Sequence, residues 1–333
     1  MRIQGMSARP VIFCFSGQGA QYRHMARDLM AEDGVFRSWM EEGDALVRDR
    51  FGFSVLAEIY DPDHAPGAPF ERLEATHPAL FMVQHAAAKA MMARGLHPDL
   101  MLGVSLGEFV AMVLSGALGY EEALTRIARQ PAMLNGLCPP ARLVSVLAGA
   151  EIREKDAVLA GATCLAGTGS PQNSVLAVED GQRDVVMNRL SVLGVPAQIL
   201  PVPYGFHTAL IEPSGEACRA MFAEIRVRMP DRPCLSSCLG GLIDPQVPAL
   251  LWRIVREQMN VPAAVACAQA RYARETGAVY IDLSPSGALA GLVRQNLAKD
   301  SPGTRASRIA LTLSPMGGNA ARLASVARRF ASG

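Results

Sequence analysis

Residues 100–114 have the sequence LMLGVSLGEFVAMVL, which places Ser105 between two apolar runs. The run from Leu100 to Val104 is short and uninterrupted, which is typical of a buried strand. The run from Leu106 to Leu114 follows at once and is predicted to be a helix. A strand that passes through a tight turn into a helix is the repeating unit of a parallel α/β sheet. The stretch therefore predicts an α/β fold, with Ser105 in a turn at the end of a strand.

The segments on either side continue this alternation. Val11 to Phe15 is an apolar run that leads into the loop Ser16 to Gly19, which predicts a buried strand and a glycine-rich loop. Apolar residues at helical spacing predict several further helices. These are expected at about Gln21 to Arg50, Ala79 to Arg94, Gly215 to Met229 and Asn319 to Gly333, with another strand at Ala278 to Leu283.

The alternation of predicted strands and helices changes between residues 138 and 203. Two helices are predicted among about four short strands, which indicates a small α+β insert. The chain is therefore expected to form a large domain from residues 1–137 and 204–333 and a small domain from residues 138–203. Inside the small domain, strands are predicted at Val144 to Ala148, Ser174 to Val178 and Gln198 to Val202, and helices at Arg153 to Ala160 and Gln182 to Leu193.

Composition narrows the classes of function. The chain has 333 residues, of which 50% are hydrophobic and 19% charged, so it can bury a sizeable core. Its 32 basic and 31 acidic residues form no basic stripe, so nothing favours binding to nucleic acid or to an anionic membrane. The seven cysteines lack zinc-site spacing, which predicts free thiols and no metal. Met1 to Pro10 is too short for a signal peptide and no apolar run has membrane-spanning length, so a soluble cytoplasmic protein is expected.

Ser105 is the candidate nucleophile. The small residues Gly103 and Gly107 permit the strained turn that lifts a serine hydroxyl clear of the sheet. The helix that begins after the serine directs its first amide groups and the positive end of its dipole to the place where an oxyanion would form. The alternative is a serine in a glycine turn with no catalytic role.

A serine hydroxyl needs a neighbouring base to act as a nucleophile at neutral pH. His207 is the best candidate, because it follows a predicted strand in the segment Tyr204 to Thr208. The other five histidines all precede Ser105, and His77 and His85 fall on or beside a predicted helix, where a structural role is expected. A structural role is also the alternative for His207 itself.

Four motifs in fixed order carry a resemblance to a known family. They are Phe15-Ser16-Gly17-Gln18-Gly19-Ala20-Gln21, Gly103-Val104-Ser105-Leu106-Gly107-Glu108, Phe206-His207-Thr208-Ala209-Leu210-Ile211-Glu212-Pro213 and Leu283-Ser284-Pro285-Ser286-Gly287. Together they resemble the malonyl-CoA:acyl-carrier-protein transacylase family, which includes the acyltransferase domains of polyketide and fatty acid synthases. The resemblance extends from about Val11 to about Leu313.

The resemblance implies a fold and a set of site residues. The fold would be an α/β-hydrolase-like large domain, interrupted by a ferredoxin-like small domain, with the active site in the cleft between them. Ser105 and His207 would form a catalytic dyad, and the backbone amides of Gln18 and Leu106 an oxyanion hole. The main-chain carbonyl of Gln258 would orient the histidine in place of an aspartate. No metal or organic cofactor is implied.

The chain departs from the family at positions that control specificity. Val104 stands where the family usually has histidine. Alignment without a gap places Gln130 where the family has an arginine that binds the malonyl carboxylate. Arg129 lies one residue earlier, about 100° round the helix, although Pro131 can distort the helix there. We therefore expect Gln130, Val104 and Phe206 to set the specificity and the pocket to favour acyl groups without a terminal charge.

This combination resembles the acyl hydrolases of trans-acyltransferase polyketide synthase systems. Those relatives cleave acyl thioesters from acyl carrier protein and so remove stalled acyl units. The alternatives are an acyltransferase for malonyl, through Arg129, or for an uncharged acyl group, and a catalytically silent scaffold domain, against which the presence of both Ser105 and His207 argues. An acidic carrier protein would also need basic residues at the mouth of the cleft, and Arg126, Arg129 and Arg271 are the candidates.

Overall fold

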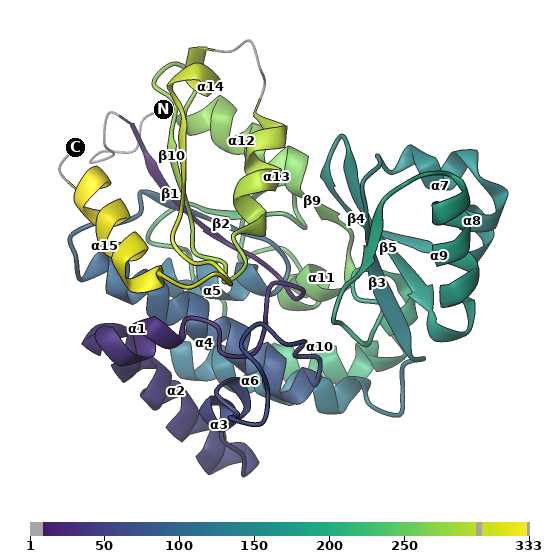
Figure 1. The fold of residues 1–333 in the computed structure, drawn as a ribbon, viewed down its shortest axis with the longest axis horizontal. Coiled ribbons are helices and arrows are strands. Elements are labelled where there is room, and N and C mark those ends of the chain that lie inside the picture. Colours follow the sequence, from purple (N-terminus) through teal and green to yellow (C-terminus); the bar gives the residue numbers. More distant parts are fainter. Residues whose placement is uncertain (1–8, 298–301, 332–333) are drawn as a thin grey trace.

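A computed structural model describes residues 9–297 and 302–331 (Figure 1). The large domain contains a six-stranded sheet in the order β11-β10-β1-β2-β7-β8, in which β8 alone runs antiparallel to its neighbour. The parallel sheet predicted from residues 100–114 is thereby confirmed. The strands are β1 (Val11–Phe15), β2 (Leu100–Gly103), β7 (Cys234–Ser236), β8 (Gly241–Leu242), β10 (Val279–Asp282) and β11 (Arg308–Leu311).

Helices cover both faces of this sheet. Alternate residues of β1 enter two separate cores: Phe13 and Phe15 pack on one face, and Ile12 and Cys14 on the other. Figure 1 shows α12 and α13 on one side of the sheet and α4, α5 and α6 on the other. The helices are α1 (Arg27–Glu32), α2 (Gly34–Phe51), α3 (Val55–Ile59), α4 (Leu73–Met92), α5 (Leu106–Leu114), α6 (Tyr120–Leu134), α10 (Gly215–Ala223), α11 (Leu250–Arg256), α12 (Val261–Tyr272), α13 (Ala288–Asn296), α14 (Pro302–Ala306) and α15 (Asn319–Phe330).

The small domain is the teal lobe in Figure 1, and its own sheet has the order β6-β3-β5-β4-β9. Across the sheet, the first four positions are taken by the fourth, first, third and second of these strands in chain order, which is the ferredoxin-like arrangement. A fifth strand, β9 (Met259–Asn260), comes from the large domain and pairs in parallel with β4. The remaining elements are β3 (Ala141–Val146), α7 (Glu151–Lys155), α8 (Ala157–Ala162), β4 (Cys164–Ser170), β5 (Asn173–Glu179), α9 (Arg183–Val192) and β6 (Ala197–Ile199).

Two helices expected to be continuous are each divided by an aspartate. The segment predicted as one helix from Gln21 to Arg50 forms α1 and α2, because the Asp33 side chain accepts a hydrogen bond from the Phe36 amide and starts a new helix. Asp156 accepts hydrogen bonds from two amides at the start of α8 and so separates it from α7.

Other predicted elements end earlier than expected: β6 ends at Ile199 and α10 at Ala223. The last two residues of the predicted C-terminal helix, 332–333, lie outside the described residues.

All seven cysteines are free, as expected. No helix within residues 9–297 and 302–331 is both long and apolar enough to cross a membrane.

Gly107, in the first turn of α5, allows this helix to lie in close contact with the backbone at the end of β1. A Cβ atom at this position would lie 2.2 Å from the carbonyl oxygen of Phe15 and 2.8 Å from that of Ser16. Both oxygens belong to the backbone at the end of a buried strand, so neither can move aside as a flexible side chain could. The close contact therefore requires glycine and fixes the turn that carries Ser105.

The substitution Gly107→Ala should lower the free energy of unfolding by about 3 kcal/mol, because the added methyl group forces α5 away from β1. Gly161→Ala is the control: Gly161 lies in α8, and a Cβ atom there meets nothing within 4 Å. It should raise the same free energy by about 0.5–1 kcal/mol, since alanine favours the helix. Denaturant titration followed by circular dichroism measures both changes, and wild-type stability in Gly107→Ala would refute this account of the turn.

Candidate active site

The carboxyl ends of β1 and β2 lie side by side and open into one pocket. Chain order along the sheet reverses at β1, since β2 flanks it on one side and β10 on the other. Ligands bind at such switch points in open α/β sheets, because the loops after the two neighbouring strands, here β1 and β10, lead to helices on opposite faces. The pocket is lined by these loops, by α13 and by the small domain, and most of its side chains are apolar, including Phe109, Ile127, Leu143, Val175, Leu200, Phe206, Leu289 and Leu292.

Ser105 occupies the strained turn that the sequence predicts. Its backbone has φ 55° and ψ −123°, a conformation that L-residues rarely adopt and that costs on the order of 1–3 kcal/mol. Such strain persists where the surrounding structure enforces it, which is common at active sites. The loop after β1 approaches closely, and a Cβ atom on Gly17 would lie 2.6 Å from the Cβ of Ser105. The turn thus presents the hydroxyl of Ser105 to the pocket.

His207 lies within hydrogen-bonding distance of Ser105. The Ser105 Oγ lies 2.7 Å from the His207 Nε2. His207 also has a positive φ, of 64°, and its backbone amide donates to the carbonyl of Val255 at 3.0 Å. No strand precedes it directly, because β6 ends at Ile199 and residues 200–208 form a loop. The long-range pairing of a serine with a histidine is the arrangement needed to activate a hydroxyl.

The carbonyl that orients His207 belongs to Glu257, which corrects the expectation for Gln258. The His207 Nδ1 lies 2.9 Å from the Glu257 carbonyl oxygen. Glu257 is the residue at which α11 ends, and its backbone is extended, so its carbonyl has no partner within the helix and is free to face the imidazole. A carbonyl oxygen can only accept, so Nδ1 carries the proton and Nε2 offers its lone pair to Ser105.

The amides expected to form the oxyanion hole lie beside the serine. Leu106 is the first residue of α5, where backbone N–H groups have no partner within the helix. Gln18 follows the loop residue Ser16, whose amide and carbonyl both bond to the buried side chain of Gln84 from α4, at 2.7 and 3.0 Å. Within the described parts of the chain, no hydrogen bond uses the amide of Gln18 or Leu106. Both amides are therefore available to a ligand.

Two polar residues that sequence reasoning did not single out hold this arrangement together. One is Gln84, which fixes the loop after β1. The other is Glu108, which is fully buried in α5 and accepts hydrogen bonds from the hydroxyls of Ser236 and Ser237 and from the amide of Cys238. Burial raises the pKa of Glu108 to about 7. Glu108 lies in one of the quoted motifs, but nothing local identified its partners 128 to 130 residues away.

The three residues expected to set the specificity lie together at the pocket. Gln130, Val104 and Phe206 all line the pocket, and Gln130 is 5% exposed. Arg129 is exposed and is not part of the lining.

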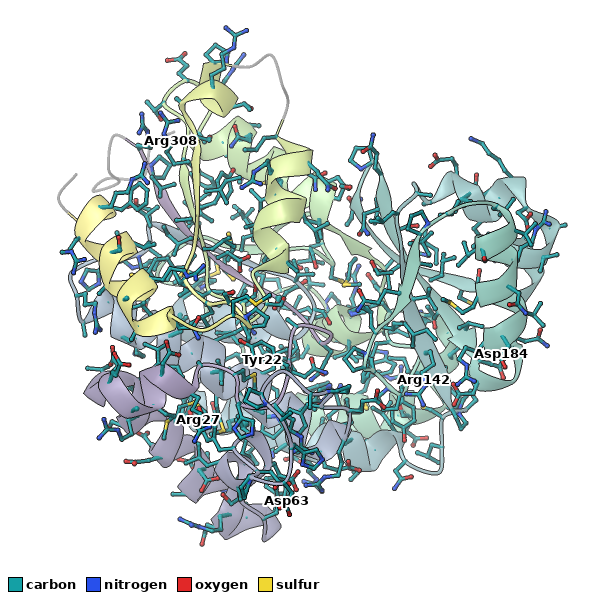
Figure 2. The ribbon with its side chains drawn as sticks, in the orientation of Figure 1. Tyr22, Arg27, Asp63, Arg142, Asp184 and Arg308 are labelled. Carbon is teal, nitrogen blue, oxygen red and sulfur yellow. The ribbon has the colours of Figure 1, made fainter. Side chains whose placement is uncertain are left out.

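The pocket wall carries no formal charge. Among the described residues that line it there is no arginine, lysine, aspartate or glutamate. The charged side chains of Asp63, Asp184 and Arg308 lie at the edge of the molecule (Figure 2). The expected rim residues are also outside the lining: Arg126 is paired with Glu224 at 2.6 Å, and Arg271 is exposed at the end of α12. A charged acyl group would therefore enter this pocket without a counter-ion.

Burial lowers the pKa of His207 to about 4, although the hydrogen bond to Glu257 opposes this shift. The imidazole is therefore neutral at pH 7 and able to accept a proton. No group of three or more histidine, cysteine, aspartate or glutamate side chains in the described residues could hold a metal ion.

Comparison with known proteins identifies the family. Residues 12–328 match the acyl transferase domain family. The chain is 34% identical to the polyketide biosynthesis acyltransferase homolog BaeD of Bacillus velezensis and 32% identical to its counterpart PksD of Bacillus subtilis, in each case over 92% of both chains. The acyl transferase domain of SpnD superposes with a TM-score of 0.84 at 23% identity, covering all of this chain and 79% of that one.

The chain therefore belongs to the acyl transferase domain family. Within that family it is similar to proteins named as polyketide biosynthesis acyltransferase homologs, and its two-domain fold is that of the solved acyltransferase domains.

The depressed pKa of His207 predicts an unusual pH profile. The kcat/KM for a small thioester, such as butyryl-N-acetylcysteamine, should show no inflection from His207 between about pH 8 and about pH 5.5, because this imidazole stays neutral well below the ordinary histidine pKa of about 6.5. Protonation of His207 should lower kcat/KM only as the pH approaches 4. Initial rates at saturating and subsaturating thioester measure this profile.

Glu108 supplies the control, because its raised pKa of about 7 gives it a titration of its own in this range. Glu108→Gln keeps the shape of the side chain and removes that titration. An inflection near pH 6.5 that persists in Glu108→Gln would contradict the depressed pKa of His207.

Proposed function

We propose that this protein is an acyl hydrolase that cleaves acyl thioesters from acyl carrier protein through an acyl-enzyme on Ser105. The observation that carries the proposal is the neutral side chain of Gln130 in the pocket wall, at the position where the resemblance to the family implies an arginine that binds malonyl. The Ser105–His207 pair supplies the chemistry, and the uncharged lining determines which acyl groups enter.

The geometry supports a two-step reaction. Nε2 of His207 takes the proton of the Ser105 hydroxyl as Oγ attacks the thioester carbonyl carbon. The resulting oxyanion lies toward the amides of Leu106 and Gln18. Collapse of this intermediate breaks the carbon–sulfur bond, and the thiol leaves with the proton from Nε2. Water then attacks the acyl-enzyme with His207 again as base, which releases the free acid and restores Ser105.

Helix α11 assists each proton transfer. The carbonyl of Glu257 keeps His207 in the tautomer that can accept at Nε2. The carbonyls at this end of the helix also carry partial negative charge, which favours the imidazolium that forms transiently. The helix end thus serves in place of a triad carboxylate.

The electrostatics of the pocket disfavour malonyl. A carboxylate that loses water on entering needs a charged partner, and leaving it unpaired costs about 3–5 kcal/mol. This corresponds to a loss of roughly a hundredfold to a few thousandfold in recognition. The exposure of Arg129 weighs against the transferase alternative in which that residue binds malonyl.

The names of the relatives, polyketide biosynthesis acyltransferase homologs, support a role for the proposed activity in polyketide biosynthesis, where it would remove stalled acyl units from carrier protein. Carrier protein is the proposed partner, and no metal or organic cofactor is proposed. Arg126, Arg129 and Arg271 remain the candidates for contact with its acidic surface.

Gln130→Arg should increase malonyl loading of Ser105 by at least about tenfold, because it restores a cation where the carboxylate would lie. The same change should impair turnover of butyryl groups, since an unpaired guanidinium would be buried in the apolar pocket. Arg129→Ala is the matched control, and it should alter neither reaction when the acyl groups are offered as N-acetylcysteamine thioesters, which need no contact with carrier protein. Intact-protein mass spectrometry of the acyl-enzyme measures loading. Efficient malonyl loading by the wild type, lost in Arg129→Ala, would contradict the assignment of Gln130.

Hydrolysis and transfer can be separated in one mixture. Acetyl- or butyryl-loaded carrier protein is incubated with the enzyme and an unloaded carrier of different mass. We expect free acid to accumulate while the second carrier stays unloaded, and Ser105→Ala and His207→Ala each to abolish release, because the two side chains act as a unit. Acyl groups that appear on the second carrier would show a transferase, and turnover by Ser105→Ala would refute the proposed nucleophile.

A further inference from the structure

Two side chains at the end of α13 bind a strand of the small domain. The Asn296 Nδ2 donates to the carbonyl oxygen of Gly169 at 2.6 Å and to that of Leu292, within its own helix, at 2.9 Å. Beside it, the hydroxyl of Ser170 donates to the Gln295 Oε1 at 2.5 Å. Gly169 and Ser170 are the last residues of β4. Gln295 and Asn296 thus form a latch between the two domains.

The latch acts at an irregular point of the small sheet. The ladder between β4 and β5 shifts register here, and Gly169 has no partner residue in it. Gly169 is buried, so its carbonyl oxygen needs a hydrogen bond, and Asn296 supplies one. A Cβ atom on Gly169 would lie 3.1 Å from the Cδ2 of Leu292, so α13 lies directly against the strand. A buried strand end of one domain is therefore held by a side chain of the other.

The preceding residues of β4 connect this strand to the catalytic base. Gly167 and Thr168 pair in parallel with β9. A Cβ atom on Gly167 would lie 2.8 Å from the backbone oxygen of Met259, so the two strands are in close contact. β9 follows shortly after Glu257, whose carbonyl accepts from the Nδ1 of His207 at 2.9 Å. One strand therefore links the latch to the carbonyl that orients the base.

The contact between α13 and β4 is also part of the pocket wall. The pocket is lined on the two sides of this contact by Leu289 and Leu292 of α13 and by Gly167, Thr168 and Gly169 of β4. His207 is 2% exposed and lines the same pocket. Burial lowers its pKa, and no charged side chain contributes to the shift. Water that entered the pocket between α13 and β4 would therefore raise this pKa.

We propose that Gln295 and Asn296 are positioning residues for the acylation of Ser105. The latch holds β4, β4 holds β9, and β9 fixes the backbone from which the Glu257 carbonyl faces His207. Neither latch residue lines the pocket, so both act through the base. The inference rests on the proposed roles of Ser105 and His207, but not on whether water or a thiol receives the acyl group.

The test removes the hydrogen bonds of the latch without adding charge, in the double variant Gln295→Met/Asn296→Leu. Acylation of Ser105 by butyryl-N-acetylcysteamine is followed in a single turnover by intact-protein mass spectrometry. At saturating thioester we expect the acylation rate to fall about ten- to a hundredfold, because a small displacement of the base is enough for such a loss.

The pH profile of the same rate distinguishes positioning from a purely structural role. The pH at which protonation of His207 halves the rate should rise in the double variant from about 4 toward the ordinary histidine value of about 6.5, because the imidazole is less well shielded from water. Glu108 is present in both proteins, so its own titration does not produce this difference.

Two single variants serve as controls. Val186→Ala weakens the core between the small sheet and α9, away from the latch and the pocket lining. It should lower the melting temperature and leave both the acylation rate and its pH profile at the wild-type values. Arg294→Ala alters an exposed residue of α13 next to the latch and should change none of the three.

A double variant that keeps either the wild-type rate or the wild-type pH profile would overturn the inference and leave the proposed nucleophile intact. Val186→Ala would also overturn it by reproducing both changes, since loss of stability would then account for them. Absence of an acyl-enzyme on Ser105 in the wild type would instead refute the proposed nucleophile, and the inference with it.

Discussion

The bond from the His207 ring to the Glu257 carbonyl is the interaction on which the site depends, because it keeps Nε2 free to receive the proton of Ser105. The acceptor is available because α11 ends at that residue. The amide of His207 is held by the same helix end, through Val255. Position and protonation of the base are therefore fixed together, by backbone atoms that no side-chain substitution removes directly.

Ser105, the proposed nucleophile, is tied to the same region by buried polar contacts. Glu108, one turn after Ser105, holds the loop that follows β7 through Ser236, Ser237 and Cys238. The carbonyl of Ser237 in turn accepts from the amide of Asn260, three residues beyond Glu257. Such satisfied networks inside a protein fix geometry more firmly than apolar packing does. The serine turn and the orienting carbonyl thus share one framework, although they lie some hundred and fifty residues apart in the chain.

Local pattern was sufficient where a structure depends on neighbours in sequence. Leu106–Leu114 forms a helix with the predicted ends, and the turn around Ser105 follows from its glycines. Local sequence pattern was not sufficient where the deciding contact comes from a distant part of the chain or from a backbone atom. Any residue type can supply a carbonyl, so the sequence could not distinguish Gln258 from its neighbour.

The short strand β9 gives the small domain a share in orienting the base. Met259 and Asn260 complete the edge of the ferredoxin-like sheet through β4, yet they continue directly from the residue that orients His207. A swing of that lobe away from the large domain would have to break this pairing or draw the chain at Glu257 with it. While the pairing of β9 with β4 survives, the cleft cannot open without moving the carbonyl that orients His207. Closure of the cleft and correct orientation of the imidazole are therefore coupled.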